Sequence, residues 1–312
     1  MNLVLLAGSA NPPLAAEVAA RLGVGLAERE ASRFPDGEMH IEIRASVRGA
    51  DVYLLQPTAP PVEDHLFQLL LLADACRRAG AARLTAIVPY MGYARHDRRA
   101  SGREPVGARV VADLLATTGL RRLVAVDLHS TALEGVFGLP LEHLSAVPLL
   151  AAELKLLAPE NGVVVAPDLG AVKLAERYAR FLQLPVAVVH KHRLTGAEVS
   201  VRGITGEVRD RAPLLVDDMI TTGGTIDAAI RALREAGSSP PAAVAATHGL
   251  FVGDAPKKLG LLHLREVVVS DSVLPPESNG LPLRRVSLAP LLAEAIRRLH
   301  QDRSLTDLIL HA

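Results

Sequence analysis

The chain has 312 residues, of which 49% are hydrophobic and 22% are charged, and its 34 basic side chains balance 34 acidic ones. This composition excludes intrinsic disorder, because enough apolar surface is available to offset the entropy of folding. A formal net charge of zero counts against a nucleic-acid-binding protein, which normally carries a basic excess. We expect about two globular domains, since one domain usually spans roughly 100–200 residues.

The single cysteine, Cys76, excludes an intramolecular disulfide and a Cys-rich zinc site, and its apolar surroundings predict a buried helical position. The N-terminal sequence MNLVLLAGSA lacks the basic residues and the long apolar core of a signal peptide. No uncharged run approaches the roughly 20 residues that span a bilayer. We therefore expect a cytoplasmic protein that binds neither a membrane nor nucleic acid.

Short runs of valine, isoleucine and leucine alternate with helical patterns along the chain. This alternation predicts βαβ units, and the continuous apolar strands indicate a mostly parallel sheet that is covered on both faces. The predicted strands are residues 3–7, 52–56, 84–89, 123–127, 163–166, 186–190, 214–217 and 244–247. The predicted helices are residues 62–79, 106–118, 169–182, 225–236 and 291–300.

The order of these patterns suggests an internal duplication. Residues 123–129 and residues 214–219 both run from an apolar strand directly into an acidic cluster, and a helix follows each of them. We therefore predict an α/β protein with two similar domains, each a mostly parallel sheet flanked by helices. The first domain is placed at residues 1–143 and the second at residues 144–290, with the C-terminal segment 291–312 packing back on the first.

The most specific segment is LLVDDMITTGGT at residues 214–225. Its small loop residues are Thr221, Thr222, Gly223, Gly224 and Thr225. The glycines allow the backbone to approach an anion, and the hydroxyls and the N-terminal amides of the next helix can donate hydrogen bonds to it. Asp217 and Asp218 can accept hydrogen bonds from sugar hydroxyls. The segment predicts a site for one phosphate of a sugar phosphate; the alternative is a helix that the two acids cap.

The segment FPDGE at residues 34–38 lies between an irregular stretch and a strand pattern at residues 39–44. It presents an aromatic ring and two carboxylates on a loop stiffened by proline, which suits a purine and its ribose. The alternative is an ordinary turn through Pro35, Asp36 and Gly37.

The segment PYMGYARHDRR at residues 89–99 follows the strand at residues 84–89. Arg95, Arg98 and Arg99 place several cations at the end of that strand, as binding of a triphosphate requires. The alternative is a solvated basic loop.

Three further segments leave predicted strands with polar side chains. VDLHS contains His129 and APDLG contains Asp168; taken alone, the histidine would be a hydrogen-bonded core residue and the aspartate a helix cap. HKHRLTGAEVS carries Lys191 and Arg193 into a stretch spaced by glycines, which predicts a mobile loop that closes over a ligand. The alternative for this last segment is an exposed polar connection.

Together these segments resemble the ribose-phosphate diphosphokinases, also called phosphoribosyl pyrophosphate synthetases, over essentially the whole chain. The segment at residues 214–225 is shared with the phosphoribosyltransferases, so the resemblance implies a duplicated phosphoribosyltransferase-like fold. Two positions depart from the family pattern: His96 stands where glutamine is usual, and Thr221 stands where many members carry an acid.

The resemblance also implies a role for each site residue. It implies that Lys191 and Arg193 are catalytic and that His129 and Asp168 hold Mg²⁺. The implied ATP-binding residues are Phe34, Asp36, Gly37, Glu38, Arg95 and His96. The implied residues for ribose 5-phosphate are Arg193, Asp217, Asp218, Thr221, Thr222, Gly223, Gly224 and Thr225.

The activity that the resemblance implies is transfer of diphosphate from ATP to the anomeric oxygen of ribose 5-phosphate, which yields phosphoribosyl pyrophosphate and AMP. It implies a homo-oligomer, because FPDGE would complete the ATP site of a neighbouring subunit. Two alternatives stay open: a phosphoribosyltransferase that consumes this product, and a regulatory paralogue without catalytic activity. FPDGE and YARHDRR count against the first, and the presence of Lys191, Arg193, His129 and Asp168 counts against the second.

Overall fold

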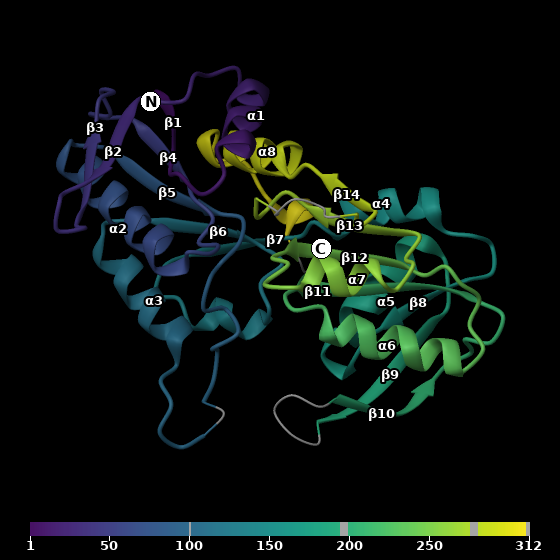
Figure 1. The fold of residues 1–312 in the computed structure, drawn as a ribbon. Helices are drawn as coiled ribbons and strands as arrows, with labels where there is room; N and C mark the ends of the chain where they lie inside the picture. The colour runs from purple at the N-terminus through teal and green to yellow at the C-terminus, as the bar shows by residue number, and fades with distance from the viewer. Residues whose placement is uncertain (100, 194–198, 275–279, 310–312) are drawn as a thin grey trace. The chain divides into compact units, whose positions relative to one another are not determined.

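The structure, a computed structural model, divides into two compact units, one formed by Met1–Ser145 with Ser287–Ala312 and the other by Ala146–Val286 (Figure 1). Each unit contains a mainly parallel sheet flanked by helices, which confirms the expected α/β class. The residues described are 1–99, 101–193, 199–274 and 280–309, with only the backbone described at 191–193 and 199–202.

The sheet of the first unit has the strand order β1-β4-β5-β6-β7, and every pairing in it is parallel. Its strands are β1 (Leu3–Ala7), β4 (Asp51–Leu55), β5 (Arg83–Val88), β6 (Arg122–Val126) and β7 (Leu141–Leu144). Four of the five match predicted strands to within one residue at either end, and β7 was not predicted. Because the strands are parallel, the segments that follow them leave from one edge of the sheet.

Helices cover both faces of this sheet (Figure 1). They are α1 (Pro12–Leu22), α2 (Val62–Arg78), α3 (Gly107–Thr117) and α8 (Ala289–His300), with short 3₁₀ turns η1 (Thr131–Gly135) and η3 (Thr306–Leu308). The apolar stripe of α2 explains its packing, because Leu66, Leu69, Ala73 and Cys76 recur every three or four residues and are all buried. The predicted buried position of Cys76 is confirmed, and its burial raises the pKa of the thiol to about 12.

The C-terminal helix α8 packs against α1 within the first unit. Ser287 Oγ donates to Glu17 Oε2 at 2.6 Å, just before the helix begins. At the other end His300 Nδ1 lies 2.8 Å from Oδ2 of the buried Asp51, which also accepts from Arg83 at 2.6 Å. These contacts attach the last helix to the beginning of β4 and β5.

An antiparallel hairpin of β2 (Arg29–Arg33) and β3 (Met39–Ile43) carries the FPDGE segment as its turn. The sequence analysis was wrong in expecting an irregular stretch before this segment. Four of the five side chains of β2 are polar and three of the five residues are exposed, so the strand has no apolar alternation from which it could be recognised.

The sheet of the second unit has the strand order β10-β9-β8-β11-β12-β13-β14, and β10 alone pairs antiparallel. Its strands are β8 (Gly162–Ala166), β9 (Val186–Arg193), β10 (Val199–Thr205), β11 (Ala212–Ile220), β12 (Ala243–Gly249), β13 (Glu266–Ser270) and β14 (Leu283–Val286). The helices are α4 (Val147–Leu157), α5 (Val172–Leu182), α6 (Gly224–Glu235) and α7 (Ala255–Gly260), with the 3₁₀ turn η2 (Leu169–Ala171). Helices α4 and α5 contact each other, whereas α6 and α7 contribute to the core on the other side of the sheet.

The expectation that Lys191 and Arg193 lie in a loop is wrong, because the backbone of both residues belongs to strand β9. Strand β9 continues to Arg193, where its backbone pairs with β10 in the register Lys191↔Val201 and Arg193↔Val199. The ladder hydrogen bonds of the hairpin extend the strand beyond its apolar part. The remainder of the predicted mobile loop, residues 194–198, lies outside the described residues.

In the described part of the chain, no helix has both the length and the apolar character needed to cross a membrane.

Candidate active site

Three of the predicted segments meet at one edge of the second sheet. Strands β9, β8 and β11 are adjacent and parallel, so their carboxyl ends lie side by side. Lys191 and Arg193 end β9, Asp168 follows β8, and the small-residue loop follows β11. Ligands of parallel α/β sheets bind beyond the carboxyl ends of the strands, which makes this edge the candidate site.

The loop after β11 is shorter than the sequence suggested. Strand β11 continues to Ile220 and α6 begins at Gly224, so only residues 221–223 lie between them. Gly223 is the N-cap of α6, with a φ of 73°, and no side chain within the described residues caps the helix. The alternative in which the two acids cap this helix is therefore wrong, and its first amides are available to an anion.

The segment after β12 supports this loop from behind. Backbone N–H groups of Leu250 and Val252 donate to the carbonyls of Ile220 and Thr221, each at 2.9 Å. Leu259 of α7 is fully buried, and a β-carbon added at Gly223 would lie 3.1 Å from its Cδ2 atom. The sequence analysis did not find these supporting residues, since no local motif marks them.

Asp168, Asp217 and Asp218 form a group of carboxylates at the same edge. Burial, followed by the charges of Asp218 and Asp168, raises the pKa of Asp217 well above its ordinary value. Asp168 Oδ1 accepts from the N–H groups of Gly170 at 3.0 Å and Ala171 at 3.3 Å, so this residue does cap the turn η2. Among the residues that the structure describes, no group of three His, Cys, Asp or Glu side chains is arranged to hold a metal ion.

In the first unit, the arginine segment and His129 follow the neighbouring strands β5 and β6. The arginine segment is tied down where it begins: Gly92 N–H donates to Thr58 Oγ1 at 2.7 Å, and Tyr93 Oη donates to Glu63 Oε1 at 2.8 Å. The rings of Tyr93 and His96 meet edge to face, with centroids 5.7 Å apart. Arg95 and His96 are exposed, as a site for a large anion requires.

His129 is exposed in the turn after β6, so the alternative in which it is a core residue is wrong. His129 belongs to the first unit and Asp168 to the second.

The FPDGE segment forms a tight turn in which Gly37 N–H donates to the Phe34 carbonyl and Phe34 N–H to the Glu38 carbonyl, both at 2.8 Å. Gly37 has a φ of 93°, which favours glycine at this position. The ring of Phe34 is 50% exposed, and an ion pair of Arg33 with Asp64 at 2.8 Å ties the hairpin to α2. The ordinary-turn interpretation of the backbone is thus right, and the turn also presents an exposed aromatic ring.

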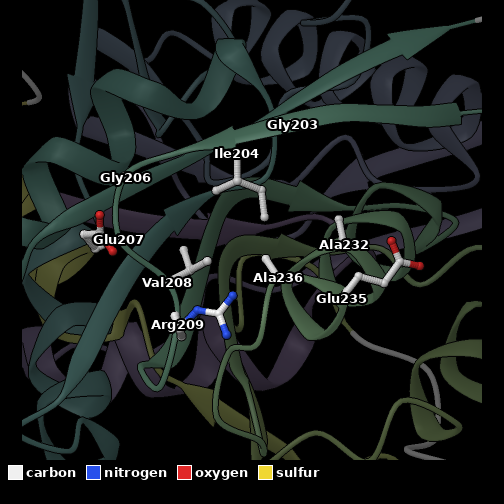
Figure 2. A pocket seen from close by; sticks show the side chains of 9 residues that line it. All are labelled: Gly203, Ile204, Gly206, Glu207, Val208, Arg209, Ala232, Glu235 and Ala236. Atoms are coloured by element: carbon white, nitrogen blue, oxygen red, sulfur yellow. The ribbon is translucent and has the colours of Figure 1, made fainter.

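A cavity of ≈ 460 Å³ lies elsewhere in the second unit (Figure 2). It is bounded by Ile204 of β10, by Val208 and Arg209 of the following turn, and by Ala232 and Glu235 of α6. These residues lie at the C-terminal end of α6, whereas residues 221–223, in the predicted phosphate site, lie at its N-terminal end. The cavity is therefore not the predicted phosphate site.

The fold defines the chain as a two-unit α/β protein in which a strand–turn–helix segment lies at the carboxyl edge of the second parallel sheet. The family model for the N-terminal domain of ribose phosphate pyrophosphokinase matches residues 3–119 of this chain. The family model for the phosphoribosyl synthetase-associated domain matches residues 195–310. A ribose-phosphate pyrophosphokinase of Nostoc sp. is 42% identical over 98% of this chain and 93% of its own length. One from Clostridium perfringens is 39% identical over 98% of this chain and 97% of its own length.

A solved structure supports the same assignment. The crystal structure of phosphoribosylpyrophosphate synthetase from Mycobacterium smegmatis matches with a TM-score of 0.91 at 40% identity, over 97% of this chain and 100% of that chain. The chain belongs to the ribose-phosphate pyrophosphokinase family, and the resemblance inferred from its motifs is confirmed.

Proposed function

We propose that the chain transfers diphosphate from ATP to the anomeric oxygen of ribose 5-phosphate, giving phosphoribosyl pyrophosphate and AMP. Similarity to ribose-phosphate pyrophosphokinases over 98% of the chain supports this activity. The observation that carries the proposal is the N-terminus of helix α6. Its N-cap residue, Gly223, provides no side chain, no described side chain caps the helix, and only three residues separate it from the strand that holds Asp217 and Asp218.

In the second unit, the 5-phosphate of the sugar accepts hydrogen bonds from the amides and hydroxyls of residues 221–225. A phosphate at this position satisfies the helix amides that no side chain caps, and it interacts favourably with the positive end of the helix dipole. The ribose hydroxyls donate to Asp217 and Asp218. Hydrogen bonds to the charged carboxylates favour ionisation, and so oppose the burial and repulsion that raise the pKa of Asp217.

In the first unit, Arg95 and His96 contact the triphosphate of ATP. Phe34, Asp36, Gly37 and Glu38 bind the purine and ribose of the ATP held by a neighbouring subunit, so the active enzyme is a homo-oligomer. The exposed ring of Phe34 on a hydrogen-bonded turn supports this role, because it offers an apolar surface for stacking.

In the reaction, the anomeric oxygen forms a bond to the β-phosphorus of ATP and loses its proton. The bond between that phosphorus and the oxygen bridging to the α-phosphorus breaks, and the oxygen leaves with AMP. Lys191 and Arg193, at the end of β9, stabilise the negative charge that develops during transfer. Positioning and charge neutralisation account for the rate, as in other phosphoryl transfers.

The donor set at the site fits Mg²⁺. The carboxylate of Asp168 supplies oxygen atoms of the kind that this ion prefers, and its repulsion with the neighbouring Asp217 favours a cation. Mg²⁺ usually takes one or two protein carboxylates together with water and phosphate oxygens, so it does not need a cluster of three side chains. We propose that Asp168 and His129 would hold the ion, the histidine through or beside water. When bound, Mg²⁺ neutralises charge on the phosphates of ATP.

We also propose a cytoplasmic location. The chain has one cysteine, which is buried, so it lacks the disulfide pairs that are common in small secreted domains.

Release of AMP tests the proposed function. The purified chain is incubated with Mg²⁺, ATP and ribose 5-phosphate, and AMP and phosphoribosyl pyrophosphate are measured; both should form in equal amounts and chelation of Mg²⁺ should stop the reaction. A chain that releases no AMP but consumes phosphoribosyl pyrophosphate with a nucleobase is a phosphoribosyltransferase. A chain inactive in both assays is a regulatory paralogue.

Substitution of Lys191 tests the catalytic assignment. We expect Lys191→Ala to lower kcat by about 10²–10³, because a contact to charge that develops in the transition state is lost. The KM for ribose 5-phosphate should stay within about twofold, since the residue acts mainly in the transition state. Lys155→Ala, an exposed lysine of α4, is the matched control and should leave kcat unchanged. Near-normal turnover of Lys191→Ala would contradict the assignment.

A further inference from the structure

The turn after β6 contains a residue other than glycine in the left-handed region. Asp127, the first residue after the strand, has a φ of 37°, which few residues other than glycine adopt, although aspartate tolerates it better than most. Its side chain is buried, Oδ1 accepts from Ser145 Oγ at 3.1 Å, and its backbone N–H donates to the Leu144 carbonyl at 3.0 Å. Contacts from the end of β7 therefore maintain this turn.

His143 of β7 holds the next residue of the turn. Its imidazole is 2% exposed, and its Nε2 accepts from the Leu128 N–H at 2.7 Å. An accepting Nε2 carries no proton, so the proton of the neutral ring is on Nδ1. Nδ1 then donates to Glu134 Oε1 at 3.1 Å. A single tautomer satisfies both bonds, and Glu134 selects that tautomer.

The residue after Leu128 is His129, whose side chain is exposed. We infer that His143 is a positioning residue: through the Leu128 N–H it fixes the backbone from which His129 extends toward the bound ion and ATP. This inference rests on the proposed role of His129. Residues that orient a metal-binding histidine typically change metal affinity or activity by about 10–100-fold when they are removed.

A purely structural role for His143 makes a different prediction. His143 is buried in the first unit, and its loss would then lower stability without a specific effect on ATP or Mg²⁺. A positioning role instead raises the concentration of Mg²⁺ needed for half-maximal rate and the KM for ATP, whereas the KM for ribose 5-phosphate, which binds the second unit, stays constant. The two roles are therefore distinguished in a single His143 variant, by comparing the changes in the Mg²⁺ requirement and in the KM for ATP with the change in the KM for ribose 5-phosphate.

The experiment uses the full-length chain with His143→Leu, His143→Gln and Glu134→Ala, each alone and combined with His129→Ala. We expect His143→Leu to raise the Mg²⁺ requirement about tenfold or more. His143→Gln should recover most of the loss, because its amide can accept from Leu128 and donate to Glu134. Glu134→Ala leaves the buried ring in place and should have an intermediate effect, so it serves if His143→Leu does not fold. In the His129→Ala background these substitutions should have no further effect, since residues that act through one group are not additive.

Amide hydrogen exchange provides a readout that does not depend on activity. Exchange at Leu128 should accelerate in His143→Leu, while the amides of Val124 and Val126 in β6 stay protected. Unchanged exchange at Leu128, or equal effects with and without His129, would overturn the inference. If the wild-type chain released no AMP, the proposed function would fail, and the exchange result would still decide whether His143 holds the turn.

Discussion

The turns after β6 and β11 both place polar residues at the carboxyl edge of a parallel sheet, but they are stabilised in different ways. In the turn after β11 the left-handed position is Gly223, which adopts a φ of 73° without steric cost. In the turn after β6 it is Asp127, whose φ of 37° is maintained by Ser145, 18 positions away in sequence. The first turn is thus encoded by its own residues and the second by residues brought to it by the fold.

The difference shows how each turn suits its proposed ligand. A phosphate can bind backbone amides from several directions, so the glycine turn needs little support beyond Leu259 and the segment after β12. A histidine near an ion must extend in one direction, and the second turn is accordingly held by buried hydrogen bonds. Loss of glycine should therefore damage the first turn, and loss of a distant side chain the second.

Among the changes that test this comparison of the two turns, the largest effect is expected at Gly223. In Gly223→Ala the backbone at this position would have a φ that is unfavourable for alanine, which costs roughly 1–2 kcal/mol. The added β-carbon would also lie 3.1 Å from Leu259. We expect kcat/KM for ribose 5-phosphate to fall about 10²-fold, measured by AMP release. Gly253→Ala is the matched control, because Gly253 also has a positive φ, of 61°, but no atom lies within 4 Å of the added carbon. Equal losses in both variants would show that the effect is general strain.

A smaller effect is expected at Ser145. Ser145→Ala removes the hydrogen bond to the buried carboxylate of Asp127, which should lower the free energy of unfolding by about 1–3 kcal/mol. Urea denaturation measures this change. The exposed Ser101→Ala serves as control and should stay within about 0.5 kcal/mol. If Ser145→Ala were as stable as the control, the second turn would not depend on this distant contact.

The smallest of the three effects is expected at Asp217, and it is an effect on stability. A raised pKa means that the folded chain binds this proton more tightly than the unfolded chain, so the wild type loses stability as the pH rises through the raised pKa. An asparagine amide cannot titrate, and Asp217→Asn should therefore be the more stable protein at neutral pH. We expect its Tm to be about 2–4 °C higher near pH 7, in the absence of ligands, with the difference vanishing below a pH of about 4.

Calorimetry at several pH values, with the exposed Asp254→Asn as control, tests this expectation. A variant that was less stable than the wild type at every pH would show that Asp217 is not destabilised by its neighbours.

The errors of the sequence analysis have a common physical origin. Strands such as β1 and β8 were found because their side chains are apolar without interruption, but β2 and the end of β9 are polar and depend on an antiparallel partner. The strand predicted at residues 214–217 ended at Asp217, yet pairing with β12 extends β11 through Asp218 to Ile220. Hydrogen bonding to a neighbouring strand cannot be read from the pattern of one strand.

By itself, the sequence determined the α/β class and the family, and it predicted an anion-binding turn at residues 221–225, because apolar periodicity and glycine act through the local backbone. Only the tertiary structure decided that Asp168 lies close enough to affect Asp217 and that Leu259 supports Gly223. It alone also showed that His143 accepts a hydrogen bond from the Leu128 N–H, in the turn before His129. These contacts join residues far apart in the chain, and their energies depend on distance and burial, which the order of residues does not specify.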